Sequence, residues 1–289
     1  MKFKSNSLKS NWRSPKTREK VFSILYFYDY NSYIYKEKLL AYYKSQSRFS
    51  NPLELIDLDY SKPSEGKIGT LPYTLIFASY AQATFVQDSR VFVNYESKII
   101  YCLNVLCQGK LQNFLFNLEP KKSELLGEIF PPSPYQESGM ISGMGVCFGG
   151  GKVIHAYGKC EIEGGEQKNC REIYFADLKE RKWATPQIVP KDSKQRARHG
   201  TTCIYFEWKG TQYLYIIGGF IFDGNKEKPS DCIEQYRVDF STNTFYHTEI
   251  NYEKKSDFNF HKCFAAPYND EILLLNPQDK GDWLCMKLK

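Results

Sequence analysis

The sequence predicts an all-β chain built from repeated four-stranded sheets, the arrangement of a β-propeller, and two observations support this. Segments of the chain match at a fixed offset of 62 residues, and the runs between turn residues are rich in β-branched and aromatic side chains. Repeats of this kind are typical of propellers and arrays, because one sheet cannot bury its faces alone. The matched pairs are Cys170 and Cys232, Tyr174 and Tyr236, Asp177 and Asp239, and the aromatic pair Trp183 and Phe245.

The clearest copy predicts four antiparallel strands. They are RHGTTCIYFEW, QYLYIIGGF, CIEQYRV and NTFYHTEI, each bounded by Gly, Asp, Asn or Pro. Gly218 and Gly219 end the second strand, where the backbone needs close approach or positive φ. Tyr236 and Phe245 supply large apolar surfaces for packing one sheet on the next.

Weaker copies flank this one. The copy before it reads GKVIHAYGK, CREIYFADL and ERKW, and the fixed offset places Ala156 and Tyr157 at the positions of the glycine doublet. The copy after it begins at FNFHKCFAAPYNDEILLLN, where His261 repeats His199, and holds three candidate strands. Upstream, residues 83–118 read as four further short strands.

These residues carry a family resemblance. With Arg198-His199 opening a strand, the Gly218-Gly219 doublet, Tyr236 and Phe245, the chain resembles the kelch β-propellers. The resemblance is specific over 138–250, suggestive over 258–289 and architectural over 68–118. It implies kelch-like four-stranded blades over residues 51–289, a rigid scaffold that displays loops to a partner. The strand count gives four blades, or five if the N-terminal aromatic run is also β, which is fewer than the family usually has.

The strand count predicts how the last sheet is completed. The final copy holds three strands, and LELIDLDY at 53–60 is a strand without an assigned partner. A propeller that joins both ends of its chain in one sheet leaves no exposed edge. We therefore expect 53–60 to close the last sheet.

The first twenty residues carry seven basic residues against one acidic residue, Glu19, while the rest of the chain is balanced. We expect residues 1–18 to be a flexible basic arm attached by charge to an acidic surface. A solvated disordered tail and a mitochondrial transit peptide are the alternatives. The basic residues are Lys2, Lys4, Lys9, Arg13, Lys16, Arg18 and Lys20.

Residues 19–50 form a separate extension, which we expect to be helical or irregular. Val21, Ile24, Leu25 and Tyr28 recur at helical spacing, and KEKLLAYYKSQ also favours helix. The two predicted short helices slightly resemble the start of an F-box, which implies a ubiquitin-ligase adaptor. The alternatives are a cap on the rim of the propeller and an added pair of strands.

Catalytic and metal-binding patterns are sparse, so we expect a non-enzyme without cofactor or metal. No GxSxG, P-loop or HExxH pattern occurs. The four histidines are His155, His199, His247 and His261, and two repeated imidazoles alone do not make a metal site. Nine cysteines without a secretory signal indicate reduced thiols in a cytoplasmic protein. Cys160 and Cys170 flank one loop and could face each other across a hairpin.

The candidate binding residues lie in the loop at 190–199, which links two predicted sheets: Lys191, Lys194, Arg196, Arg198 and His199. Loops on a rigid scaffold often carry binding, and this loop lacks the aromatic platforms that RNA binding would need. No apolar run is long enough to span a membrane.

The sequence predicts a non-catalytic protein-interaction module or scaffold subunit of a multi-subunit complex, with a partner whose surface is acidic. A ubiquitin-ligase adaptor, a structural component of a cytoskeletal or ciliary complex and a propeller enzyme are the rival functions.

Overall fold

The computed structural model describes residues 3–5, 31–35, 38–42, 52–57, 67–72, 84–94, 99–107, 110–117, 122–127, 143–161, 165–177, 180, 182–193, 195–223, 226–250, 258–268, 271–276 and 282–287. Over these residues the chain is mostly β, with one 3-10 turn at Phe260–Lys262, which confirms the all-β prediction. No helix in the described part is long and apolar enough to cross a membrane. Contacts divide the chain into two units, one of residues 1–5 with 130–289 and one of residues 6–129.

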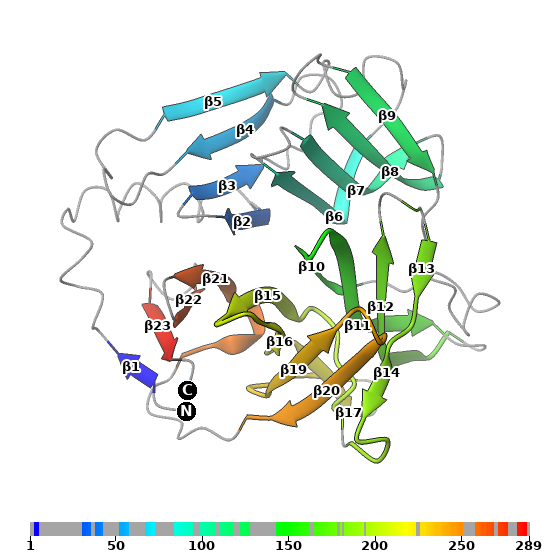
Figure 1. Ribbon diagram of the computed structural model, residues 1–289, viewed down its shortest axis with the longest axis vertical. Helices are drawn as coiled ribbons and strands as arrows, with labels where there is room; N and C mark the ends of the chain where they lie inside the picture. Colours follow the sequence, from blue (N-terminus) through cyan, green and yellow to red (C-terminus); the bar gives the residue numbers. More distant parts are fainter. Residues whose placement is uncertain are drawn as a thin grey trace. The chain divides into compact units, whose positions relative to one another are not determined.

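Two neighbouring sheets of the first unit correspond to the two best sequence copies (Figure 1). Sheet I is antiparallel and is formed, in order, by β10 (Gly145–Gly149), β11 (Lys152–Glu161), β12 (Gln167–Asp177) and β13 (Lys182–Ala184). Sheet II has the same antiparallel order in β15 (Thr202–Trp208), β16 (Thr211–Ile217), β19 (Ile233–Asp239) and β20 (Thr244–Glu249). The four strands predicted for the clearest copy and the three predicted for the copy before it are therefore confirmed, and β10 is a fourth strand of sheet I that was not predicted.

Two elements beside the four strands of sheet II were not predicted. A short strand, β14 (Gln187–Val189), pairs in parallel with β20 at the outer edge of the sheet. A separate hairpin of β17 (Phe220–Asp223) and β18 (Lys226–Pro229) is inserted between β16 and β19.

The register of the two sheets confirms the 62-residue repeat. Ala176 pairs with Trp183 in sheet I, and Val238 pairs with Phe245 in sheet II. Asp177 and Asp239 each end the third strand of their sheet. The last hairpin of each sheet is thus the same structure, with aromatic side chains at one equivalent position.

Sheet III completes the first unit and corrects the predicted closure. Its strands are β21 (Phe264–Tyr268), β22 (Glu271–Asn276), β23 (Asp282–Lys287) and β1 (Phe3–Ser5), where β1 pairs antiparallel with β23. The last sheet is completed by an N-terminal strand, as expected, but not by 53–60. The strand there, β4 (Pro52–Asp57), pairs instead with β5 (Lys67–Pro72). Because β1 occupies the edge of β23, residues 52–57 pair instead with the strand that follows them in the chain.

The structure also corrects the predicted N-terminal arm at residues 3–5. Lys4 belongs to strand β1, opposite Cys285, because the edge of β23 offers backbone groups that pair with any extended segment. The expectation of a flexible segment is therefore wrong for these three residues. The other basic residues of the arm lie outside the described residues.

Among the described residues of the first unit, two apolar cores join the sheets. One lies between sheets I and II and contains Ile154, Tyr236 and Phe245, each fully buried. The other lies between sheets II and III and includes Phe260 and Leu274. Alternating side chains along each strand point into these cores, as the period of two requires.

The second unit is also made of strands. Its four-stranded antiparallel sheet is formed by β6 (Thr84–Asn94), β7 (Ile99–Cys107), β8 (Lys110–Asn117) and β9 (Lys122–Gly127). Residues 83–118 were expected to hold all four strands, but the strands are longer than predicted, so the fourth falls at 122–127. Irregular pairing, including a shift between Phe85 and Arg90, accompanies this length.

The helix predicted within 19–46 is wrong where the structure describes it. Residues 31–35 and 38–42 form strands β2 (Asn31–Tyr35) and β3 (Lys38–Tyr42), paired as a hairpin. The sequence of β2, with tyrosine at positions 33 and 35 around Ile34, is rich in residues with high β-propensity, which favours a strand over a helix. The open alternative of an added strand pair is what forms, and the helical basis of the F-box resemblance is lost there. Residues 19–30 and 43–46 lie outside the described part.

Candidate functional site

The predicted binding loop enters sheet II at the same end as the inserted hairpin. Thr202, the first residue of β15, pairs with Ile217, the last residue of β16, and Ile217 pairs with Ile233, the first residue of β19. The loop at 190–199 precedes β15, and the β17–β18 hairpin lies between β16 and β19. Both segments therefore emerge from one end of the sheet.

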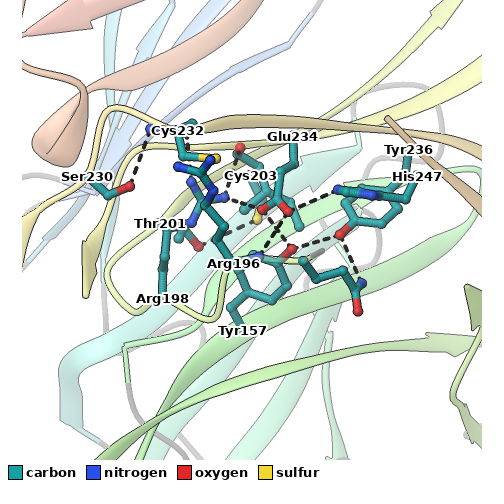
Figure 2. A network of polar contacts seen from close by, with 12 residues as sticks. Tyr157, Arg196, Arg198, Thr201, Cys203, Ser230, Cys232, Glu234, Tyr236 and His247 are labelled. Atoms are coloured by element: carbon teal, nitrogen blue, oxygen red, sulfur yellow. Dashed lines mark hydrogen bonds and ion pairs between the residues drawn. The ribbon is translucent and has the colours of Figure 1, made fainter. Parts of the chain in front are cut away.

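A buried carboxylate organises this end of the sheet (Figure 2). Glu234 on β19 is 1% exposed. Its Oε2 accepts from Arg198 Nη2 at 2.5 Å and from Tyr157 Oη at 2.8 Å. Its Oε1 accepts from the backbone N–H of Arg196 at 3.2 Å and is 3.0 Å from His247 Nε2. Two contacts on each oxygen satisfy the carboxylate, which makes its burial tolerable.

The proton order of the adjoining hydroxyl groups follows from these contacts. Tyr157 donates its one proton to Glu234, so in the 2.7 Å contact between the two phenols Tyr236 must be the donor. Tyr236 in turn accepts from Gln195 Nε2 at 3.0 Å. The relay therefore runs from Gln195 in the loop through two tyrosines to Glu234. Burial, followed by the charge of Glu234, raises the pKa of Tyr236, so the phenol stays protonated.

Arg198 joins the loop to the interior of sheet II. Its side chain is 0% exposed, and besides Glu234 it donates from Nη1 to the carbonyl of Cys232 at 2.7 Å. The guanidinium also lies over the ring of Tyr157, 5.5 Å from the centroid. Among the described residues its Nε has no hydrogen-bond partner. Removing one partner of such a buried pair leaves an uncompensated charge, which typically costs about 3–5 kcal/mol.

His199 holds a second, separate set of contacts. Its Nδ1 is 2.7 Å from Asn169 Oδ1 on β12, and its Nε2 is 3.0 Å from Glu227 Oε1 on β18. The imidazole stacks on Phe222, with the ring centroids 4.9 Å apart. Lys159 on β11 donates to the same Glu227 oxygen at 3.2 Å. These contacts fasten the inserted hairpin to sheet I.

The two groups affect each other's pKa. Burial lowers the pKa of His199 below its usual 6.5, and the hydrogen bond to Glu227 opposes this shift in part. Burial would raise the pKa of Glu227, but hydrogen bonds and charge from Lys159 and His199 outweigh it and lower the pKa. At neutral pH the Glu227 carboxylate is therefore ionised and the His199 imidazole is neutral, while the Lys159 ammonium group contacts the same carboxylate.

The structure places the predicted loop residues in two environments. Lys191 and the side chain of Arg196 are exposed, as a binding loop requires. The expectation that Arg198 and His199 also lie on the surface is wrong. The buried Arg198 side chain pairs with Glu234, and the buried His199 side chain contacts Asn169 and Glu227. Lys194 lies outside the described residues.

The remaining histidines and cysteines take structural positions. His199 and His261 do come close to one point, since both contact the ring of Phe220. Within the described ranges, no group of three or more His, Cys, Asp or Glu side chains is arranged to hold a metal ion. Cys160 and Cys170 lie across the β11–β12 hairpin, and both thiols approach the carbonyl of Lys168, at 3.8 and 4.0 Å. Burial, and then the hydrogen bond with Cys160, raises the pKa of Cys170, which keeps it in the unreactive thiol form.

Four residues of the network were not predicted as site residues: Tyr157, Gln195, Glu234 and His247. Glu234 carries no local signal, since four of the seven residues of its strand, IEQYRVD, are polar or charged. Tyr157 carries a sequence signal, because it stands where the fixed offset predicts a glycine. Gln195 has no signal of its own.

Comparison with known proteins does not supply a family. No family model matches the chain, and no curated protein matches it. Among solved structures, one described as "Structure of YjhT" matches with 12% identity and a TM-score of 0.49, covering 86% of this chain and 71% of that chain. The functional argument below therefore uses the chain's own geometry.

Proposed function

We propose that this protein is a non-catalytic protein-interaction module that presents the loop at 190–197 from a kelch-type propeller. The observation that carries the proposal is the network around Glu234. Three hydrogen-bonding groups from residues 195–198 enter it: the Gln195 amide, the Arg196 backbone N–H and the Arg198 guanidinium. The same loop leaves the Lys191 and Arg196 side chains exposed.

These hydrogen bonds hold the loop in one conformation, which affects the entropy cost of binding. A loop that is already held in one conformation loses little conformational entropy when a partner binds. The buried Glu234 fixes one end of the loop, and the exposed side chains of the loop include Lys191 and Arg196 against one acid, Asp192. The arrangement fits a partner with an acidic surface, and the exposed charges would raise the association rate more than the affinity.

The sheet arrangement of the first unit supports the propeller. Three four-stranded antiparallel sheets follow one another in the chain order I, II, III, with β14 as an extra strand in sheet II. Their first strands contact one another in sequence, β10 with β15 and β15 with β21. Radial stacking of blades through their first strands would produce these contacts. A ring of four or five blades is the form we propose for the whole chain.

The absence of catalysis in this proposal rests on how the titratable groups are used. Glu234 is saturated by donors from three elements, and His199 is held between Asn169 and Glu227. An acid or base that works in catalysis needs access to a substrate proton. These groups are committed to the scaffold instead.

The test is purification of partners from a cell extract by the protein and by a charge-reversed variant, Lys191→Glu/Arg196→Glu. We expect the variant to lose the acidic partners that the wild-type chain retains. The matched control is Lys182→Glu, an exposed cation at the opposite end of the strands in sheet I. Equal partner sets for all three proteins would contradict the proposal.

A further inference from the structure

The loop at 190–197 is attached to the interior of sheet II through its second half. Its hydrogen bonds to the buried network begin at Gln195 and continue to the Arg198 guanidinium. Within the described part of the chain, no side chain of residues 191–193 is hydrogen-bonded to another residue. The first half of the loop therefore lies at the surface, where an enzyme that modifies side chains can reach it.

Ser193 supplies a hydroxyl group to this first half. Its backbone N–H donates to the carbonyl of Pro190 at 3.0 Å, which closes a turn, and its side chain is partly exposed. Thr201, the next hydroxyl residue along the chain, is buried against the backbone of the seam instead. A hydroxyl that a kinase phosphorylates must enter the active site of the kinase, and of these two side chains only that of Ser193 is accessible.

The charges around Ser193 form a pattern that basophilic kinases select. Lys191 precedes the serine by two residues, Lys194 follows it by one and Arg196 follows it by three. Kinases discriminate among substrates partly by such charge patterns around the acceptor hydroxyl. Position and sequence therefore agree on Ser193 as an acceptor.

A phosphate on Ser193 would cancel the charge on which the loop depends for binding. Residues 190–197 contain three basic side chains and one acidic side chain, Asp192, which leaves a net charge of +2. A phosphoserine carries about −1.5 to −2 charges at neutral pH. The modified loop would be close to neutral, and the attraction to an acidic surface would be lost.

We infer that Ser193 is a phosphorylation site and that its phosphate weakens the binding of an acidic partner by the loop at 190–197. This inference rests on the proposed function and adds its regulation. In the reaction, the Ser193 oxygen forms a bond to the terminal phosphorus of ATP, and the bond from that phosphorus to the bridging oxygen breaks, which releases ADP. The hydroxyl proton passes to the catalytic base of the kinase.

The first test asks whether the folded loop accepts a phosphate. The full chain is incubated with ATP, Mg²⁺ and a purified basophilic serine kinase, and mass spectrometry locates the phosphate. We expect phosphate on Ser193 and none at this position in Ser193→Ala. A synthetic peptide of residues 188–200 is the control for the sequence alone. Modification of the peptide without modification of the folded chain would overturn the inference, and so would modification of neither.

The second test measures the effect of the phosphate on binding. The probe is a fluorescein-labelled peptide of glutamate residues, and its binding to the full chain is followed by fluorescence anisotropy. The unmodified chain is compared with a chain that carries phosphoserine at position 193, installed during translation. The control chain carries phosphoserine at Ser241, an exposed residue in the β19–β20 turn at the other end of the strands. Urea unfolding midpoints establish that all three chains are folded.

We expect phosphoserine at position 193 to weaken binding about fivefold or more, since about two favourable charges are cancelled. The loss should shrink as salt rises from about 0.05 to 0.3 M, and phosphoserine at position 241 should change the affinity by less than about twofold. Unchanged affinity of the chain modified at 193, or equal losses from the two modifications, would overturn the inference and leave the proposed function standing. Failure of the unmodified chain to bind the peptide would overturn both.

Discussion

Sheets I and II are two copies of one repeat, and in each of them a glycine contacts the segment that leads into the next sheet. In sheet I, Gly158 pairs with Cys170, and its N–H donates to the carbonyl of Arg198 at 2.8 Å. In sheet II, Gly218 donates to the carbonyl of Cys232 and lies against the carbonyl of Phe260. Cys170 and Cys232 are 62 residues apart, and so are Arg198 and Phe260. A glycine in each sheet thus receives the segment that leads into the following sheet.

The two seams differ in chemistry. At the seam between sheets I and II, the entering residue is Arg198, and a buried ion pair with Glu234 fills the space. At the seam between sheets II and III, the entering residue is Phe260, which packs on Phe258 in an apolar core. An apolar seam stabilises through burial alone, whereas the polar seam also fixes the conformation of the loop that precedes it. The repeated strands therefore determine the arrangement of the sheets. The ion pair of Arg198 with Glu234, which the second seam lacks, holds the loop that carries the candidate binding residues.

Breaking the polar seam should have the largest effect. Glu234→Leu leaves the Arg198 guanidinium buried without its carboxylate, and we expect a loss of about 4 kcal/mol in the free energy of unfolding. For a unit of this size that lowers the melting temperature by roughly 10 °C. Urea unfolding followed by circular dichroism measures the change.

The double variant Arg198→Met/Glu234→Leu sharpens the comparison. It makes the first seam apolar like the second, and we expect it to recover most of the stability lost in Glu234→Leu, because no buried charge remains. Its loop should nevertheless be less ordered, since Arg198 no longer anchors it. A double variant as unstable as the single one would show that the seam depends on shape rather than on charge pairing.

The glycine at the second seam is the next test. Gly218 has φ +64°, and a methyl group there would lie 1.9 Å from the Phe260 carbonyl oxygen. We expect Gly218→Ala to cost about 3 kcal/mol, because the backbone of the entering segment has to shift. Gly210→Ala is the control: its φ is +73°, but no atom lies within 4 Å. It should cost about 1 kcal/mol, and equal losses in the two variants would mean that close approach is unimportant at this seam.

Most strands of sheets I and II could be predicted, because they follow from local sequence patterns. The offset between Tyr174 and Tyr236 predicted two like hairpins, and the register confirms it. The position of the seam glycine in sheet I was misplaced, since the fixed offset assigned Ala156 and Tyr157 to the doublet. The equivalent glycine is Gly158, two residues further along, because the stretch from Gly158 to Cys170 is two residues shorter than the stretch from Gly218 to Cys232. A single sequence does not show where a strand pairing slips.

The candidate site was predicted in part, for a similar reason. Lys191 and Arg196 are exposed as expected, because a charged loop is usually solvated. Arg198 looks like the same kind of residue, and its burial depends on Glu234, which follows 36 residues later. Pairings of this range leave no local signal. Strand β1 was not predicted because it has three residues, and hydrophobic periodicity cannot be recognised over so short a segment.

Removing one hydroxyl from the polar seam should have a moderate effect. Tyr157→Phe deprives Glu234 of a donor and leaves the Tyr236 hydroxyl without its acceptor, so we expect a loss of about 1–2 kcal/mol. Tyr246→Phe is the control, because this half-buried ring on β20 lies under Arg237 and outside the network. The urea midpoint measures both variants. A Tyr157→Phe variant as stable as its control would contradict the proton order inferred for the relay.

The smallest effect should come from pH, through the imidazole that fastens the hairpin across the polar seam. The pKa of His199 is lowered in the folded state by burial, so the unfolded chain takes up the proton more readily. Its contribution to stability is therefore fully present above pH 6.5, the usual pKa, and is lost as the pH falls toward the folded value. His199→Gln should remove this part of the pH dependence while retaining a side chain that can reach Asn169 or Glu227. We expect urea midpoints of the wild type to fall more between pH 7.5 and 5.5 than those of the variant. Parallel curves would show that His199 does not change its protonation on unfolding, and the hairpin would then be held independently of pH.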